Sequence, residues 1–166
     1  RDWSSDVCSS DLVLLLTISV VTVQKAEAVF ETLPAEKADR IVLGADTIVW
    51  QDGKVLGKPK DAQEARQMIS SLQGRTHSVF TGVTLMGACL PQKEISFHCE
   101  TIVHVHEMDE GEIEEYISTG EPFDKAGGYG IQGSFGVYIK GIEGDYYNVV
   151  GLPVAEVCRR LRETFR

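Results

Sequence analysis

Several features that would place this chain in a familiar class are missing from its sequence. It has no excess of positive charge: the formal net charge is −9 at pH 7, which argues against a general nucleic-acid surface. Its four cysteines form no CxxC pair, a usage typical of a reduced, cytoplasmic protein. The apolar run Leu12–Val23 is about half as long as a membrane-spanning helix, so we expect no membrane insertion.

The sequence also lacks internal repeats, low-complexity tracts and linkers. Its 166 residues, 43% of them hydrophobic, are enough for one domain with its own core. Residues 1–12 have neither a starting Met nor periodicity, and they resemble a translated sequencing-adapter artefact that fold reasoning should leave out. We therefore expect an artefactual tail at 1–12 and a single domain at 13–166. The β-branched run Leu12–Val23 is expected to be either a buried strand or sequence of doubtful origin.

Two short β-branched runs, Ile41–Leu43 and Ile48–Trp50, predict buried strands separated by Gly44-Ala45-Asp46-Thr47. Asp46 is then expected where a buried strand ends. A carboxylate there must be solvated, paired or bound to a metal, because an unpaired buried charge is too unfavourable. The simpler alternative is that Asp46 caps a turn beside Gly44.

Helical and hairpin signals account for most of the remaining chain. We expect helices over Val23–Leu33, Asp61–Leu72 and Asp109–Thr119 and after Pro153, a tight turn at Asp52-Gly53, a long hairpin formed by Thr76–Ala88 and Glu94–Glu107, and a strand over Ser134–Ile142. His98, His104 and His106 alternate on the second hairpin strand and share one face. A metal site is conceivable there, and a half-exposed face is the simpler interpretation.

A glycine-rich block at Gly120–Gly133, GEPFDKAGGYGIQG, is the second candidate site. Its glycines permit close approach of the backbone to a ligand, and Asp124, Lys125 and Gln132 flank them. Lys58, held beside Pro59, is either a point charge for a phosphate or an ordinary loop lysine.

Taken together, five blocks occur in a fixed order: GADT, GKP, GRTHSVFTGV, the glycine-rich block and GDYYNVVGLP. From about Lys25 to the C-terminus, this order resembles the Maf family of nucleoside triphosphate pyrophosphatases. The resemblance implies an α/β (α+β mixed) fold related to inosine triphosphatases, with an elongated mixed sheet flanked by helices and a central cleft. It also suggests a homodimer.

The resemblance implies a hydrolase that cuts nucleoside triphosphates between the α- and β-phosphates. Asp46 takes the place of the catalytic base. Together with Asp124 it could instead hold a divalent metal, usually Mg²⁺, with Mn²⁺ as another choice. Lys25, Lys58 and Lys125 are the candidates for phosphate contacts.

Thr47 and Gln132 match the subfamily that hydrolyses dTTP and UTP in the house-cleaning of nucleotide pools, since an amide suits the O4 and N3–H edge of thymine or uracil. The family's N-terminal Ser-x-Ser-Pro-Arg-Arg loop is not found. The chain is therefore expected to be truncated, and as written it could be inactive. The alternatives are a non-catalytic nucleotide-binding or cell-division (septum) regulatory module and a pyrophosphatase for modified nucleotides.

Overall fold

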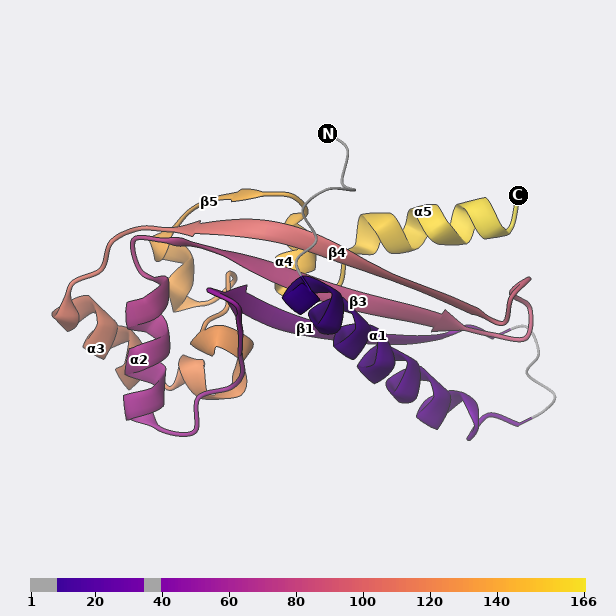
Figure 1. The fold of residues 1–166 in the computed structure, drawn as a ribbon, viewed down its shortest axis with the longest axis horizontal. Helices are drawn as coiled ribbons and strands as arrows, with labels where there is room; N and C mark the ends of the chain where they lie inside the picture. The colour runs from indigo at the N-terminus through magenta and orange to yellow at the C-terminus, as the bar shows by residue number, and fades with distance from the viewer. Residues whose placement is uncertain (1–8, 35–39) are drawn as a thin grey trace. The chain divides into compact units, whose positions relative to one another are not determined.

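The computed structural model describes residues 9–34 and 40–166, which divide into two compact units (Figure 1). Unit 1 comprises the described residues up to Asp46 together with Thr81–Cys99 and Gly151–Arg166. Unit 2 comprises Thr47–Phe80 and Glu100–Val150. Three strands therefore run from one unit into the other.

One antiparallel five-stranded sheet, in the order β2-β1-β3-β4-β5, is flanked by helices. The elements are α1 Ser9–Phe30, β1 Val42–Gln51, β2 Lys54–Leu56, α2 Ala62–Leu72, β3 Thr76–Met86, β4 Glu94–Val105, α3 Glu110–Ser118, the 3₁₀ helices η1 Glu121–Asp124, η2 Ala126–Gly128 and η3 Ser134–Tyr138, β5 Ile139–Glu143, α4 Tyr146–Val150 and α5 Val154–Thr164. The predicted α/β class is confirmed.

The predicted strand at Leu12–Val23 is wrong, because this run lies within the 22-residue helix α1. Its buried side chains Leu14, Ile18, Thr22 and Ala26 are spaced by four residues, the helical repeat. Burial along this face outweighs the β-propensity of the branched residues. The first eight residues of the expected tail lie outside the described residues.

The strand expected to break at Gly44-Ala45-Asp46-Thr47 is continuous, so Asp46 lies within β1 rather than at a turn. Gly44 has a packing role there. A Cβ at this position would lie 2.5 Å from the carbonyl oxygen of Thr22 in α1. Glycine therefore lets helix and strand approach more closely than any side chain would permit.

The helices predicted to begin at Asp61 and Asp109 and the turn predicted at Asp52-Gly53 are confirmed. Asp61 accepts a hydrogen bond from Glu64 N at the start of α2, and Asp109 and Glu112 form a reciprocal capping box at the start of α3. Asp52 and Gly53 both have positive φ, 50° and 78°, as a two-residue hairpin turn requires.

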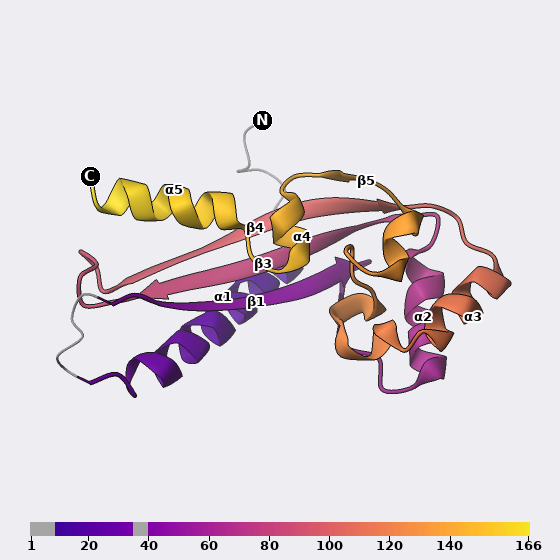
Figure 2. The ribbon, with the colours of Figure 1, turned by 180° about the vertical axis from the view of Figure 1, so that it is seen from behind.

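Each unit has its own hydrophobic core. In unit 1, Val83, Leu85, Leu90 and Phe97 from the sheet region pack with Val157 of α5. In unit 2 the core includes Phe135 and residues of β1, β3, β4, α2 and α3, and α2 and α3 lie side by side in both ribbon views (Figures 1 and 2). No helix in the described part of the chain is both long and apolar enough to span a bilayer.

The strand predicted over Ser134–Ile142 is confirmed only in its second part. Its first part is the 3₁₀ helix η3, and only Ile139–Glu143 pair with β4. The fully buried ring of Phe135 contacts Tyr116, Tyr129 and Tyr138, with centroid separations of 5.0, 4.8 and 5.7 Å. Packing of this aromatic cluster holds the segment out of the sheet.

Candidate active site

The predicted residues Lys25 and Asp46 meet in unit 1. Lys25 Nζ, on α1, lies 2.5 Å from Asp46 Oδ1 on β1 and 3.5 Å from the carbonyl oxygen of Ala45. The two side chains are 50% and 33% exposed, so the ion pair is open to solvent and to a ligand. The structure thus brings together a carboxylate and an ammonium group that are 21 residues apart in the sequence.

Two glycines set the position of this pair. Gly44 lies under the backbone of Thr22 and Ala26, and a Cβ on Gly82 in β3 would lie 3.0 Å from Ile18. Figure 1 shows α1 in front of β1 and β3, and Figure 2 shows it behind them, so the helix covers one sheet face of unit 1. Lys25, one turn beyond Thr22, therefore comes within reach of Asp46.

Buried hydroxyl groups fix the same helix laterally. Thr22 Oγ1 lies 2.9 Å from Thr84 Oγ1 on β3, which lies 2.9 Å from Ser96 Oγ on β4. Thr22 and Thr84 are fully buried. Because buried polar atoms must pair, these contacts favour one register of α1 on the sheet, and that register places Lys25.

A second group of predicted residues gathers in unit 2. Lys125 Nζ lies 2.8 Å from Asp124 Oδ1. The hydrogen bond from Lys125, helped by the nearby charge of Lys58, lowers the pKa of Asp124 below its ordinary value. Lys58, Asp124 and Lys125 therefore share one electrostatic neighbourhood, although Lys58 lies far from the others in the sequence.

Glycines hold this second group together as well. Gly127 has φ of +71° and donates from its N–H to the carbonyl oxygen of Gly57 at 2.9 Å. A Cβ on Gly128, whose φ is +74°, would lie 3.8 Å from Cγ of the buried Pro59. The Lys58-Pro59 loop is thus packed against the glycine-rich block, as close approach by glycine allows.

Gly130 accommodates the stem of Lys125. A Cβ at Gly130 would lie 2.7 Å from Cε and 2.8 Å from Cδ of that lysine. The aliphatic part of Lys125 therefore runs across the bare backbone of Gly130, which fixes where the ammonium group emerges.

Sequence reasoning missed a set of hydrogen bonds that joins the two ends of the glycine-rich block. The Glu121 carboxylate accepts hydrogen bonds from Ser134 N, at 3.1 and 2.9 Å, and from Ser134 Oγ at 2.6 Å. These bonds lower the pKa of Glu121. The exposed Gln132 lies within the loop that these hydrogen bonds close, two residues before Ser134. The only sequence signal was an acid and a serine at the two ends of the block.

Sequence reasoning also missed His77, from the GRTHSVFTGV block. It is 4% exposed, its Nε2 lies 2.6 Å from the hydroxyl oxygen of Tyr129, and its Nδ1 has no partner among the described residues. Burial, and secondarily the proximity of His104, lowers the pKa of His77 to about 4. The imidazole is therefore neutral at pH 7.

Thr47 follows Asp46 directly in β1 and is half-buried. Successive side chains of a strand point to opposite faces, so Thr47 and Asp46 do not share a face of the sheet. The specificity roles of Thr47 and Gln132 stay predictions.

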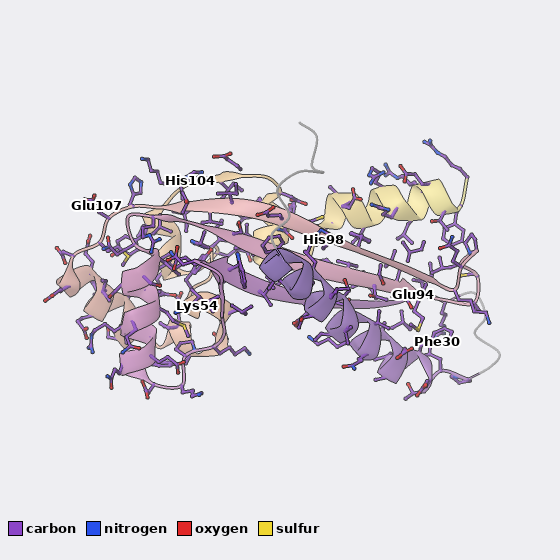
Figure 3. All side chains as sticks on the ribbon, in the orientation of Figure 1. Phe30, Lys54, Glu94, His98, His104 and Glu107 are labelled. Carbon is purple, nitrogen blue, oxygen red and sulfur yellow. The ribbon has the colours of Figure 1, made fainter. Side chains whose placement is uncertain are left out.

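The three histidines predicted to share one strand face have different surroundings, and His106 lies beyond the end of β4. His104, labelled in Figure 3, lies on the stretch of β4 that pairs with β5, and its Nε2 lies 2.8 Å from Glu143 Oε1. His98 and His106 are exposed. Within residues 9–34 and 40–166, no three or more His, Cys, Asp or Glu side chains gather into a group that could hold a metal.

The carboxylate of Asp46 nevertheless fits a weakly held Mg²⁺. Its Oδ1 faces Lys25, and a third of the side chain is exposed. Mg²⁺ commonly uses one or two protein carboxylates and completes its shell with water and substrate phosphates. Such a cation would need its other ligands from the substrate rather than from a protein cage.

Comparison with known proteins places these features in a family. The model of the family described as "Maf-like protein" matches residues 15–164. A dTTP/UTP pyrophosphatase of Bacillus cytotoxicus is 49% identical over 93% of this chain and 74% of its own length. Another, from Agathobacter rectalis, is 52% identical over 75% of this chain and 62% of its own length. The matched region contains all five blocks, and the chain belongs to the Maf-like protein family.

Proposed function

We propose that this protein is a nucleoside triphosphate pyrophosphatase that hydrolyses dTTP and UTP to the monophosphate and pyrophosphate. The observation that carries the proposal is its 49% identity, over 93% of the chain, to a relative named dTTP/UTP pyrophosphatase. The similarity covers 154 residues of the chain. In a chain with a net charge of −9, the ammonium groups of Lys58 and Lys125 offer local positive charge for a polyphosphate.

Asp46 is the proposed general base. A carboxylate on a regular strand keeps its direction, and its partial exposure lets a water molecule approach it. Lys25 Nζ pairs with Oδ1 of this carboxylate and helps to hold its direction. Lys25 itself is proposed to contact a phosphate once a nucleotide offers it a competing anion.

Lys58 and Lys125 are the proposed phosphate ligands of unit 2. Asp124 pairs with Lys125 and would release it, at least partly, to a more highly charged phosphate. Charge that develops on the departing pyrophosphate would be offset by these ammonium groups.

Asp46 in unit 1 and Asp124 in unit 2 are the proposed carboxylates for a divalent cation, Mg²⁺ or Mn²⁺. When bound, such a cation polarises the phosphoryl oxygens and offsets their charge. Thr47 and the amide of Gln132 are proposed to select thymine and uracil, because an amide can both donate to O4 and accept from N3–H.

The decisive experiment measures pyrophosphate release from dTTP and UTP in the presence of Mg²⁺. Asp46→Asn should lower kcat about 100-fold or more, the usual contribution of a general base. Asp52→Asn is the matched control. It makes the same chemical change on the turn after β1, at a residue with φ of 50° that pairs with Arg75, and asparagine tolerates that backbone conformation. It should leave kcat unchanged.

Equal rates for wild type and Asp46→Asn would remove Asp46 from the mechanism. A shift in the Mg²⁺ concentration needed for half-maximal rate would favour a metal-ligand role over a base role. Nucleotide binding without turnover would favour the regulatory alternative, and faster hydrolysis of inosine or methylated nucleotides would favour the modified-nucleotide alternative. The homodimer and the cytoplasmic location stay predictions.

A further inference from the structure

The contact between His77 and Tyr129 joins the third strand to the glycine-rich block inside unit 2. His77 Nε2 and the Tyr129 hydroxyl oxygen are 2.6 Å apart, and the two rings stand edge to face, with centroids 5.3 Å apart and planes inclined by 80°. Both side chains are buried, at 4% and 6% exposure. This hydrogen bond therefore has one well-defined geometry and does not exchange freely with solvent.

Stability alone does not explain a histidine at this position. Nδ1 of His77 is buried and has no partner within the described residues, and an unmade hydrogen bond of this kind is unfavourable by about 1–3 kcal/mol. Apolar replacements for both partners would be close to neutral for folding. A histidine that bonds to Tyr129 at this position therefore needs an explanation other than folding stability.

The segment that Tyr129 anchors is intrinsically loose. Gly127 and Gly128 precede it, both with positive φ, and Gly130 follows it. Glycines give the unfolded and locally opened chain the most conformational freedom, so their arrangement must be imposed from outside.

Three contacts impose the arrangement of these glycines, each from a different part of unit 2. Gly127 N donates to Gly57 O at 2.9 Å, and the Tyr116 hydroxyl donates to Gly128 O at 3.1 Å. The third contact is the bond between Tyr129 and His77. It is the one nearest to Gly130, whose backbone supports the stem of Lys125.

We propose that His77 is a positioning residue. Through its hydrogen bond to Tyr129 it fixes the backbone at Gly130, and thereby the place where the Lys125 ammonium meets a nucleotide phosphate. The assignment of a phosphate to Lys125 rests on the proposed function. The fixing of the backbone by His77 does not, and the two parts are tested separately.

The first test is amide hydrogen exchange, which needs no substrate. Tyr129→Phe and His77→Leu should speed exchange at residues 127–130 at least several-fold while exchange in α2 stays unchanged. His77→Gln, which keeps a polar group at the Nε2 position, should restore slow exchange. Unchanged exchange in Tyr129→Phe would overturn the proposal.

The second test compares turnover of dTTP in two backgrounds. Tyr129→Phe should lower kcat about 10-fold in the wild-type background, because a misplaced ligand weakens transition-state contacts. In a Lys125→Met background it should change kcat less than twofold, since the affected group is already gone. An equal loss in both backgrounds would show a general structural role and overturn the proposal.

Thermal unfolding of each variant is measured alongside, so that a variant unfolded at the assay temperature is replaced by the His77→Gln comparison. If the wild type hydrolyses neither dTTP nor UTP, the proposed function fails. The exchange experiment then still decides whether His77 fixes the glycine-rich block.

Discussion

The two units each present a lysine–aspartate pair, and they position it in opposite ways. In unit 1, Lys25 and Asp46 project from a long helix and a long strand that pack directly on each other through Gly44. In unit 2, Asp124 ends the short 3₁₀ helix η1, and Lys125 links it to the short 3₁₀ helix η2 in a glycine-rich segment. One pair is placed by regular secondary structure and the other by individual hydrogen bonds.

This difference predicts where each unit is vulnerable. A framework of helix and strand fails when packing between the two is disturbed, and folding stability then falls together with activity. A segment held by separate anchors can lose its geometry while the rest of the unit stays folded. Substitutions at matched glycines separate the two cases.

Gly44→Ala should have the largest effect. The new Cβ would lie 2.5 Å from Thr22 O and 3.0 Å from Ala26 N, both backbone atoms that cannot rotate away. We expect the free energy of unfolding to fall by about 3 kcal/mol, with loss of the Lys25–Asp46 contact and of turnover. Urea unfolding measures the change. Gly141→Ala is the control, because its Cβ meets nothing within 4 Å. A Gly44→Ala protein as stable as the control would contradict the framework interpretation.

The pH dependence of stability should reveal His77. Its pKa is about 4 in the folded protein and about 6.5 when unfolded, so between these values the unfolded state binds more protons. Stability should therefore decline as pH falls below about 6.5, by about 2 kcal/mol between pH 7 and pH 5. His77→Gln cannot titrate and should flatten this decline, as urea unfolding at the two pH values would measure. A decline of the same size in both proteins would refute the buried, neutral state of His77.

Gly130→Ala should separate activity from stability. Its Cβ would meet Cε and Cδ of Lys125, the far end of a flexible side chain that can swing aside. We expect kcat/KM for dTTP to fall about 10-fold while the free energy of unfolding changes by less than about 0.5 kcal/mol. Steady-state kinetics and urea unfolding on the same sample give both numbers. Loss of stability comparable to that of Gly44→Ala would erase the contrast between the units.

The smallest change in folding stability is expected from a substitution in α5 of unit 1. Hydrogen bonds from Arg159 and then Arg160 lower the pKa of Glu156 from 4.5 to about 2. Its contribution is therefore present above about pH 4.5 and lost as pH falls towards 2. Glu156→Gln should lower stability by about 0.5 kcal/mol at pH 7 and by nothing near pH 2, because the pair is largely solvated. A larger loss of folding stability at low pH than at neutral pH would contradict this prediction.

Local signals in the sequence predicted the elements whose causes are local. The caps of α2 and α3 and the Asp52-Gly53 turn depend on residues within four positions of each other, so their patterns can be read directly. The apolar pattern of a helix is a less reliable guide to which of its side chains are buried. In α5, Val157 is buried, whereas the apolar residues Val154, Cys158 and Phe165 are all exposed. A short helix at the end of a chain meets its core on a narrow stripe, whose width the sequence does not state.

Candidate site residues could be selected from the sequence because carboxylates, lysines and clustered glycines carry recognisable chemistry. Their supports could not. His77 and Glu121 looked ordinary, and their importance comes from partners 52 and 13 residues away. A hydrogen bond between distant residues leaves no periodicity in a single sequence.

By itself, the sequence determined the family blocks, the capped helices and the choice of Asp46, because each depends on residue type and short spacing. Only the tertiary structure decided that Leu12–Val23 is helical and that Gly44 serves packing rather than a turn. Both outcomes depend on which surfaces are buried against each other, and burial free energy between distant segments exceeds local backbone preference.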